Sequence, residues 1–292
     1  MRAWKVLGLA GLAGVVATGA VVARGERRRR AYTPADVRVR LHERLERGPA
    51  APAATGGAAA PPVPEGSTLT LEQAVDLTRT GDIWIFRGRS PADHLIRAFT
   101  NAPVNHVGMA VVLDDLPPLM WHAELGRSLP DLWSGTHHRG VQLHDLRDAV
   151  VTWANRYGQR AWLRQLSGDV TPDMEAALLR EIARKDGLPF PATFGLARRW
   201  LRGRLRRPAA LEVAYCAETV AAAYQAMGLL GAERPTNWYD PGRFWSGDRL
   251  DLAPGYALGD ELAVAVERTA TVGSPAPSGR TPGMHRERLR QL

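Results

Sequence analysis

The feature that most constrains this chain is a segment that cannot contribute to a hydrophobic core, residues 48–66. It reads GPAAPAATGGAAAPPVPEG, a composition typical of a flexible or partly extended spacer. We assign residues 31–66 to a linker, in which residues 31–47 form at most a short charged helix. Residues 268–292 also lack a core pattern and are expected to be a disordered tail. What remains is one folded domain, residues 67–267, long enough for a buried core.

The N-terminus carries an uncharged apolar run of 18 residues, VLGLAGLAGVVATGAVVA, at positions 6–23. This is just long enough to cross a bilayer as a helix, so we predict that residues 1–30 are a single-pass membrane anchor with a basic flank. A cleaved signal peptide is the alternative, but its cleavage would leave the arginine block at 27–30 on the mature N-terminus. The basic excess after the run favours a cytoplasmic catalytic domain, and the exported orientation is the alternative.

The formal net charge is +8, but Lys5 and Lys185 are the only lysines. So strong a preference for arginine, with many Ala, Gly and Pro, is typical of coding bias in a GC-rich genome. The sequence contains no recognisable nucleic-acid-binding motif. We therefore expect solvated surface arginines and no nucleic-acid partner.

The pattern of the central part predicts an α+β domain with a small antiparallel sheet. Helices are expected at residues 70–78, 91–100, 171–185 and 217–227, since these segments combine helical spacing with N-cap residues or a terminal glycine. Strands are expected at residues 83–86, 107–113, 119–125, 140–143 and 161–166.

Cys216 is the only cysteine, so the chain cannot form an internal disulfide. It directly precedes the helical sequence AETVAAAYQAMG. The positive end of a helix dipole lowers the pKa of a thiol, and the free N–H groups of the first turn can bind an oxyanion. Cys216 is therefore the candidate nucleophile.

A thiol nucleophile needs a proton acceptor, and His106 opens the predicted strand in NAPVNHVGMAVV. His122 and Glu124 lie two residues apart on the next strand and so share one face. If the two strands form a hairpin, either side chain can lie beside His106 and hold its ring. The sequence does not decide between His122 and Glu124 as this third group.

Together, GDIWIFRG, NHVGMAVV, MWHAELG and AYCAETVAAAYQAMG resemble the permuted NlpC-type papain-like amidases, most closely the bacterial YiiX/YaeF-like subgroup. The matching motifs span residues 81–228, with the His strand before the Cys helix as in the permuted group. The resemblance implies a papain-like α+β fold, with a central antiparallel sheet packed against helices, and a Cys–His–polar triad. The third group is usually Glu in this subgroup and often His in related enzymes.

This resemblance implies a membrane-anchored cysteine hydrolase, an amidase/peptidase or an acyl-ester hydrolase/transferase. Its substrate would be an amide or ester, such as a cell-wall peptide or a lipid or lipoprotein acyl group. The alternative is a catalytically inactive member that serves as a membrane-tethered binding module. We expect no cofactor and no metal, because His137 and His138 have the setting of a solvated loop. The oligomeric state is open.

Overall fold

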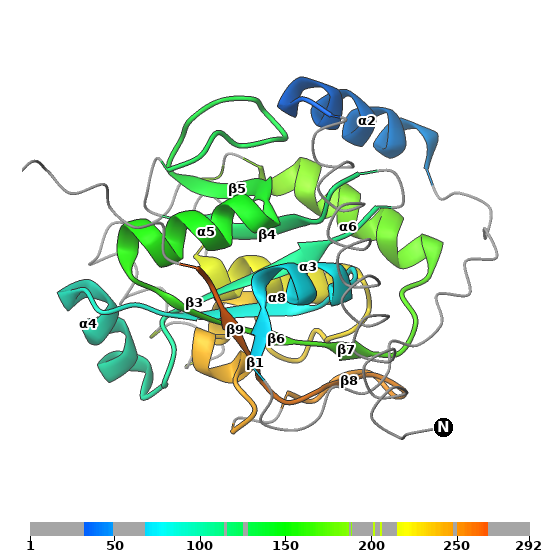
Figure 1. Ribbon diagram of the computed structural model, residues 1–292. Coiled ribbons are helices and arrows are strands. Elements are labelled where there is room, and N and C mark those ends of the chain that lie inside the picture. Colours follow the sequence, from blue (N-terminus) through cyan, green and yellow to red (C-terminus); the bar gives the residue numbers. More distant parts are fainter. Residues whose placement is uncertain are drawn as a thin grey trace, which may run out of the picture.

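The computed structural model of the chain describes residues 32–48, 68–113, 116–124, 128–186, 188, 201, 205, 215–247 and 250–267 (Figure 1). Its centre is a seven-stranded sheet with the strand order β1-β9-β6-β2-β3-β4-β5. Only the pairing of β1 with β9 is parallel among these strands. The predicted α+β class with a central, mostly antiparallel sheet is confirmed.

The sheet strands are β1 (Thr68–Thr70), β2 (Ile83–Arg87), β3 (His106–Val111), β4 (Leu119–Glu124), β5 (Gly140–Asp145), β6 (Arg160–Arg164) and β9 (Leu262–Ala265); β7 (Leu166–Ser167) pairs with β8 (Ala257–Leu258). The helices are α2 (Pro34–Arg47), α3 (Leu71–Leu77), α4 (Pro91–Thr100), α5 (Leu146–Tyr157), α6 (Pro172–Lys185) and α8 (Cys216–Ala226), with 3₁₀ turns η1 (Thr236–Trp238) and η2 (Pro241–Phe244).

The sheet is covered on both faces, so its strands are buried almost throughout. Helix α8 contacts β3 and β4 on one face, and α5 contacts β4 and β5 (Figure 1). Side chains alternate between the faces along each strand. Val107 and Met109 of β3 therefore join the core cluster around α8, whereas Ala110 joins the cluster that contains Trp153 of α5.

Capping residues set the helix starts that the sequence predicts. Thr70 and Ser90 form capping boxes at the starts of α3 and α4, and Thr171 caps α6. Gly228 follows the last turn of α8 with φ 76°, a conformation that favours glycine. Helix α5 was not predicted, although Asp145 caps it and Gly158 ends it in the left-handed region.

Helix α2 belongs to the folded domain, which differs from the predicted linker at residues 31–66. Its Val37 and Leu41 are buried in the core cluster around α8, and its Arg44 forms an ion pair at 2.7 Å with Glu175 of α6. The high density of arginine conceals this short apolar stripe. The expected anchor at residues 1–30 and the expected tail at 268–292 lie outside the described residues.

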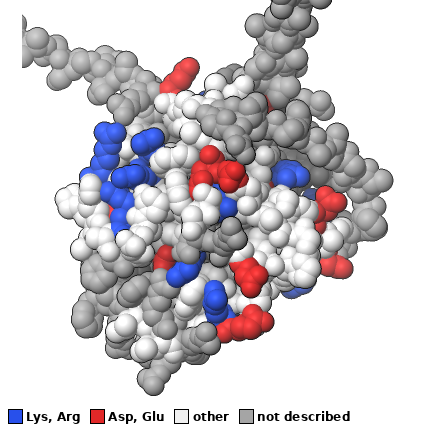
Figure 2. Space-filling view, turned by 90° about the horizontal axis from the view of Figure 1, so that it is seen from below, with Lys and Arg blue, Asp and Glu red and all other residues white. Residues whose placement is uncertain are grey.

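In the part of the chain that the structure describes, no helix has the length and apolar character that crossing a membrane requires. The described residues on the face shown in Figure 2 carry both signs of charge: basic side chains are densest at the left of the view, and elsewhere basic and acidic side chains are interspersed.

The buried carboxyl of Asp82 joins β2 to the chain after β6. It accepts hydrogen bonds from the backbone N–H groups of Arg79 and Leu166, both at 2.8 Å. Burial raises its pKa from 3.8 to about 7, against the two N–H bonds and the Arg79 charge. The folded protein therefore holds this proton more tightly than the unfolded chain between those two values.

We expect the free energy of unfolding to fall as the pH rises from about 4 to about 7, because the folded state then loses a proton that it favours. Urea denaturation across this range measures the slope. Asp82→Asn should flatten it, since the amide does not titrate, whereas Asp173→Asn in the exposed first turn of α6 should leave it unchanged. Equal slopes in the two variants would contradict this role of Asp82.

Candidate active site

Cys216 is the first residue of α8, and its thiol lies among backbone N–H groups. The backbone N–H groups of Val107, Ala217 and Cys216 itself face its Sγ and favour the thiolate. The preceding residue, Tyr215, has no capping side-chain bond; its hydroxyl instead donates to the carbonyls of Asn237 and Tyr239. These two bonds hold the chain before α8 against the η1 turn and fix where the helix begins.

The pKa of the thiol is raised rather than lowered, which corrects the expectation from the sequence. Cys216 is only 5% exposed. Burial raises its pKa from 9.0 to about 11, and the three backbone N–H groups offset only part of that increase. The loss of water around a thiolate thus outweighs the helix dipole here. At neutral pH, Cys216 is a protonated thiol.

His106, the first residue of β3, does not meet this thiol through its side chain: its ring packs on Phe86 and Trp153, whereas Cys216 lies in the core cluster around α8 on the other face of the sheet. The backbone of β3 does come close, because the N–H of Val107, which directly follows His106, faces the Cys216 sulfur. The His106 ring is half-buried and packs against Phe86, Trp153 and His122, with ring centroids 5.8, 4.9 and 5.4 Å away. Its Nε2 is buried without a hydrogen-bond partner. Burial lowers its pKa to about 3, so the imidazole is neutral at pH 7.

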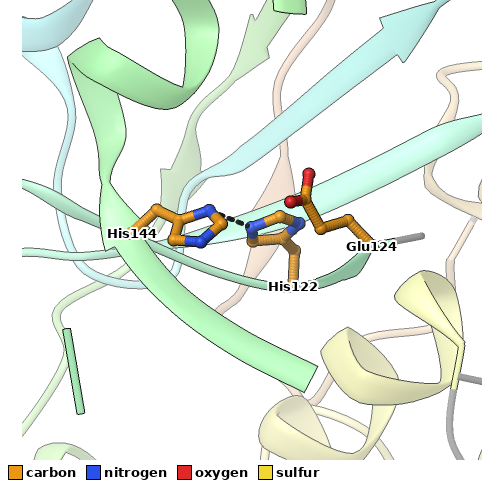
Figure 3. Close-up of side chains that lie close together, drawn as sticks. All are labelled: His122, Glu124 and His144. Carbon is orange, nitrogen blue, oxygen red and sulfur yellow. Dashed lines mark hydrogen bonds between the residues drawn. The ribbon is translucent and has the colours of Figure 1, made fainter. Parts of the chain in front are cut away.

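The two candidates for the third group both lie on β4, on the same face as His106. His122 is fully buried, and its ring contacts that of His106 edge to face. The carboxylate of Glu124 is bound elsewhere: Ser128 Oγ and Trp153 Nε1 each donate to it at 3.0 Å. Figure 3 shows His122 and Glu124 on β4, with His144 of β5 beside His122. The ring contact favours His122, although no hydrogen bond joins its Nε2 to His106 because that atom bonds to His144.

Three residues of this site were not identified from the sequence: Gln142 and His144 on β5, and Trp153 on α5. The strand at residues 140–143 was expected, and the spacing of Gln142 and His144 places them on one face. The register of β5 against β4, which pairs His122 with Gln142, could not be predicted from the sequence. Trp153 was missed because α5 itself was missed.

Two groups of described residues have ligand atoms within 4.8 Å of one another and could hold a metal ion: His122, Glu124 and His144; and Asp131, His138 and Asp186. The first is a buried two-histidine, one-carboxylate set, a ligand type used for Zn²⁺. A 3.0 Å hydrogen bond already joins its two imidazoles (Figure 3). Neither group was predicted from the sequence, because the residues of each come from separate elements.

Two residues near the start of α8 and in the η1 turn, Glu218 and Trp238, interact with charged side chains. Glu218, in the first turn of α8, is 2% exposed and lies near Lys185 of α6, whose pKa is lowered by burial and raised in part by Glu181 and Glu218. Trp238 packs against the guanidinium groups of Arg234 and Arg243. Glu218 therefore has a structural role between two helices.

The pKa of Cys216 leads to a prediction for its alkylation. Because Cys216 is the only cysteine, alkylation of the chain's thiol measures the reaction of Cys216 alone. The rate with iodoacetamide should be low at pH 7 and rise with pH up to about 11, because only the thiolate reacts. The urea-unfolded chain, in which the thiol has its ordinary pKa of 9.0, is the control and should level off earlier. Mass spectrometry follows both reactions. A plateau below pH 7 in the folded protein would contradict a neutral thiol.

Comparisons with known proteins give little support for a family. No family model matches the chain, and no curated protein matches it. Among solved structures it is similar to YiiX from Escherichia coli O157:H7, described as a metalloprotein, with 20% identity and a TM-score of 0.35. The match covers 50% of this chain and 64% of YiiX, so the chain spans less than two thirds of that protein's length.

Proposed function

We propose that this chain is a cysteine hydrolase of the permuted NlpC type, with Cys216 as nucleophile and His106 as its general base. One observation supports the proposal: the backbone N–H that directly follows His106 faces the Cys216 sulfur. The start of α8 thus meets the start of β3, and the proposed pair requires the His106 ring to turn from its packing on Trp153 toward the thiol. The neighbouring ring of His122 is the third group that such a pair requires.

In the proposed reaction, the resting pair is a neutral thiol and a neutral imidazole, as their shifted pKa values require. As Sγ attacks the substrate carbonyl carbon, its proton passes to His106. The Ala217 and Cys216 N–H groups face the sulfur and are suited to the developing oxyanion. His106 then gives the proton to the leaving amine or alcohol, which forms a thioester on Cys216. Water hydrolyses the thioester and restores the thiol.

The substrate is proposed by chemical class as an amide or ester carbonyl. Cell-wall peptides and lipid or lipoprotein acyl groups both meet this description. An anchor at residues 1–30 would keep the enzyme near membrane substrates, and a cytoplasmic orientation would favour acyl groups over the cell wall. The same chain as an inactive, membrane-tethered binding module is the second candidate. The 5% exposure of Cys216 favours that candidate, because it limits access to the sulfur.

A panel of chromogenic substrates tests the proposal. The full chain is incubated with p-nitrophenyl esters of increasing acyl length and with p-nitroanilides of short peptides, and release of the leaving group is followed. Turnover that is lost after complete iodoacetamide alkylation at high pH supports a thiol enzyme, and the preferred series identifies the substrate class. No release from either series, or release that survives alkylation, would favour the binding module.

A further inference from the structure

We propose that Gln142 and His144 are positioning residues that fix which nitrogen of His122, and through it of His106, carries the proton. Together they form a directional relay from β5 to the base. The inference rests on the proposed function for its catalytic consequence. The proton positions themselves follow from hydrogen bonds alone.

The relay begins at Gln142, whose amide can point only one way. Gln142 is fully buried, and its Nε2 donates to the backbone carbonyls of His138 at 2.6 Å and Gly140 at 3.4 Å. A carbonyl cannot pair with an amide oxygen, so these two acceptors fix the NH₂ group. Its Oε1 is therefore an acceptor, and it lies 2.9 Å from Nε2 of His144. His144 must carry its proton on Nε2.

The same argument determines which nitrogen of His122 carries its proton. A neutral imidazole has a single N–H, so each ring donates one hydrogen bond and accepts at its other nitrogen. With its proton on Nε2, His144 can only accept at Nδ1. That atom lies 3.0 Å from Nε2 of His122, as drawn in Figure 3. His122 is the donor in this bond, and its Nδ1 is left with a lone pair.

Two buried nitrogens without hydrogen-bond partners, one on His122 and one on His106, connect this series of hydrogen bonds to the proposed base. Nδ1 of His122 and Nε2 of His106 are both buried without a hydrogen-bond partner, on rings whose centroids are 5.4 Å apart. Buried polar atoms without partners are uncommon, and here one is an acceptor beside a possible donor. A turn of the two rings toward each other pairs them.

This pairing would make Nδ1 of His106 the base. With its proton on Nε2 and directed at His122, His106 has a lone pair only on Nδ1. In the proposed reaction that atom takes the proton of the Cys216 thiol once the His106 ring has moved within reach of it, and the resulting imidazolium donates its Nε2–H to His122. No other proton moves. Glu124 is outside the relay because its oxygens accept from Ser128 and Trp153.

Nitrogen-15 NMR of the full chain tests the proton positions at pH 7 without any activity. Selectively labelled histidine should show the Nε2–H tautomer for His144 and His122. Gln142→Met removes the acceptor and should abolish this preference at His144. Gln225→Met is the matched control, because Gln225 also donates to two backbone carbonyls but lies outside the relay. Either ring protonated on Nδ1, or a preference that survives Gln142→Met, would overturn the relay.

The rate of acylation tests the catalytic consequence. His144→Leu should slow acylation of Cys216 by a p-nitrophenyl ester about tenfold to a hundredfold, the effect of leaving a buried donor unpaired. His144→Asn should recover most of this loss, because its Oδ1 can accept from His122 in place of Nδ1. Equal rates in the two variants would show a packing role only and would overturn the positioning role.

Two further outcomes separate this inference from its alternatives. If the unmodified chain is never acylated, the proposed function fails, and the NMR result still decides the proton positions. Elemental analysis of the purified full chain addresses the metal alternative. One equivalent of bound metal that His144→Asn removes would overturn the relay, because a metal between the two imidazoles needs a lone pair on both facing nitrogens.

Discussion

Replacing Cys216 by alanine is expected to abolish hydrolysis, with a loss on the order of 10⁶-fold in kcat, as for nucleophile removal in a serine protease. The physical reason is that no other described side chain at the helix start can form the thioester. Steady-state release of the leaving group from the preferred p-nitrophenyl ester measures the loss. Full activity in Cys216→Ala would end the thiol mechanism.

The control for this prediction is folding, because Cys216 is packed into the core cluster around α8. Thermal unfolding of Cys216→Ala should give a melting temperature close to that of the unmodified chain, since only one sulfur atom is removed. Cys216→Ser keeps a hydrogen-bonding atom among the same backbone N–H groups and provides a second inactive variant. Loss of activity in both variants, with intact folding, assigns the loss to chemistry.

Replacing His106 by alanine should lower kcat nearly as much, because a thiol with a pKa of about 11 attacks slowly without a base. The double variant Cys216→Ala with His106→Ala should be no worse than Cys216→Ala alone, since the two groups act as one unit. Added imidazole should restore part of the rate in His106→Ala by filling the space of the lost ring. The same kinetic assay measures all three effects.

His42→Ala is the matched histidine control for this series. His42 is exposed on α2 and stacks on Trp133, with ring centroids 4.6 Å apart. Its loss should leave turnover unchanged, and imidazole should have no effect on it. If His106→Ala keeps the activity of His42→Ala, His106 is not the base and the proposed Cys–His pair is wrong.

The sequence predicts those elements of this fold whose signals are local. Caps at Thr70, Ser90 and Thr171 mark helix starts through side-chain bonds that span three residues, so no tertiary information is needed. The order of the sheet has no such local signal. Strand β9 pairs with β1 and β6 across most of the chain, and α2 is held by a few apolar contacts that its charge pattern conceals.

For the site, the sequence predicts the residue types and their neighbours along the chain but not their environment. Cys216 at a helix start indicates a lowered pKa, and only the complete packing around it shows that burial outweighs the dipole. His144 was missed for a related reason. Its importance comes from a contact with His122 across a strand pair, and the register of that pair is set by the whole sheet.

Intact-protein mass spectrometry with peptide mapping tests the central claim most directly. The full chain is mixed with an excess of a p-nitrophenyl ester, quenched in acid within the first turnovers, and digested. The account predicts one acyl group per chain, on the peptide that contains Cys216, which is absent from Cys216→Ala and much slower to form in His106→Ala. An acyl group on another residue, or an equal rate of labelling with and without His106, would contradict it.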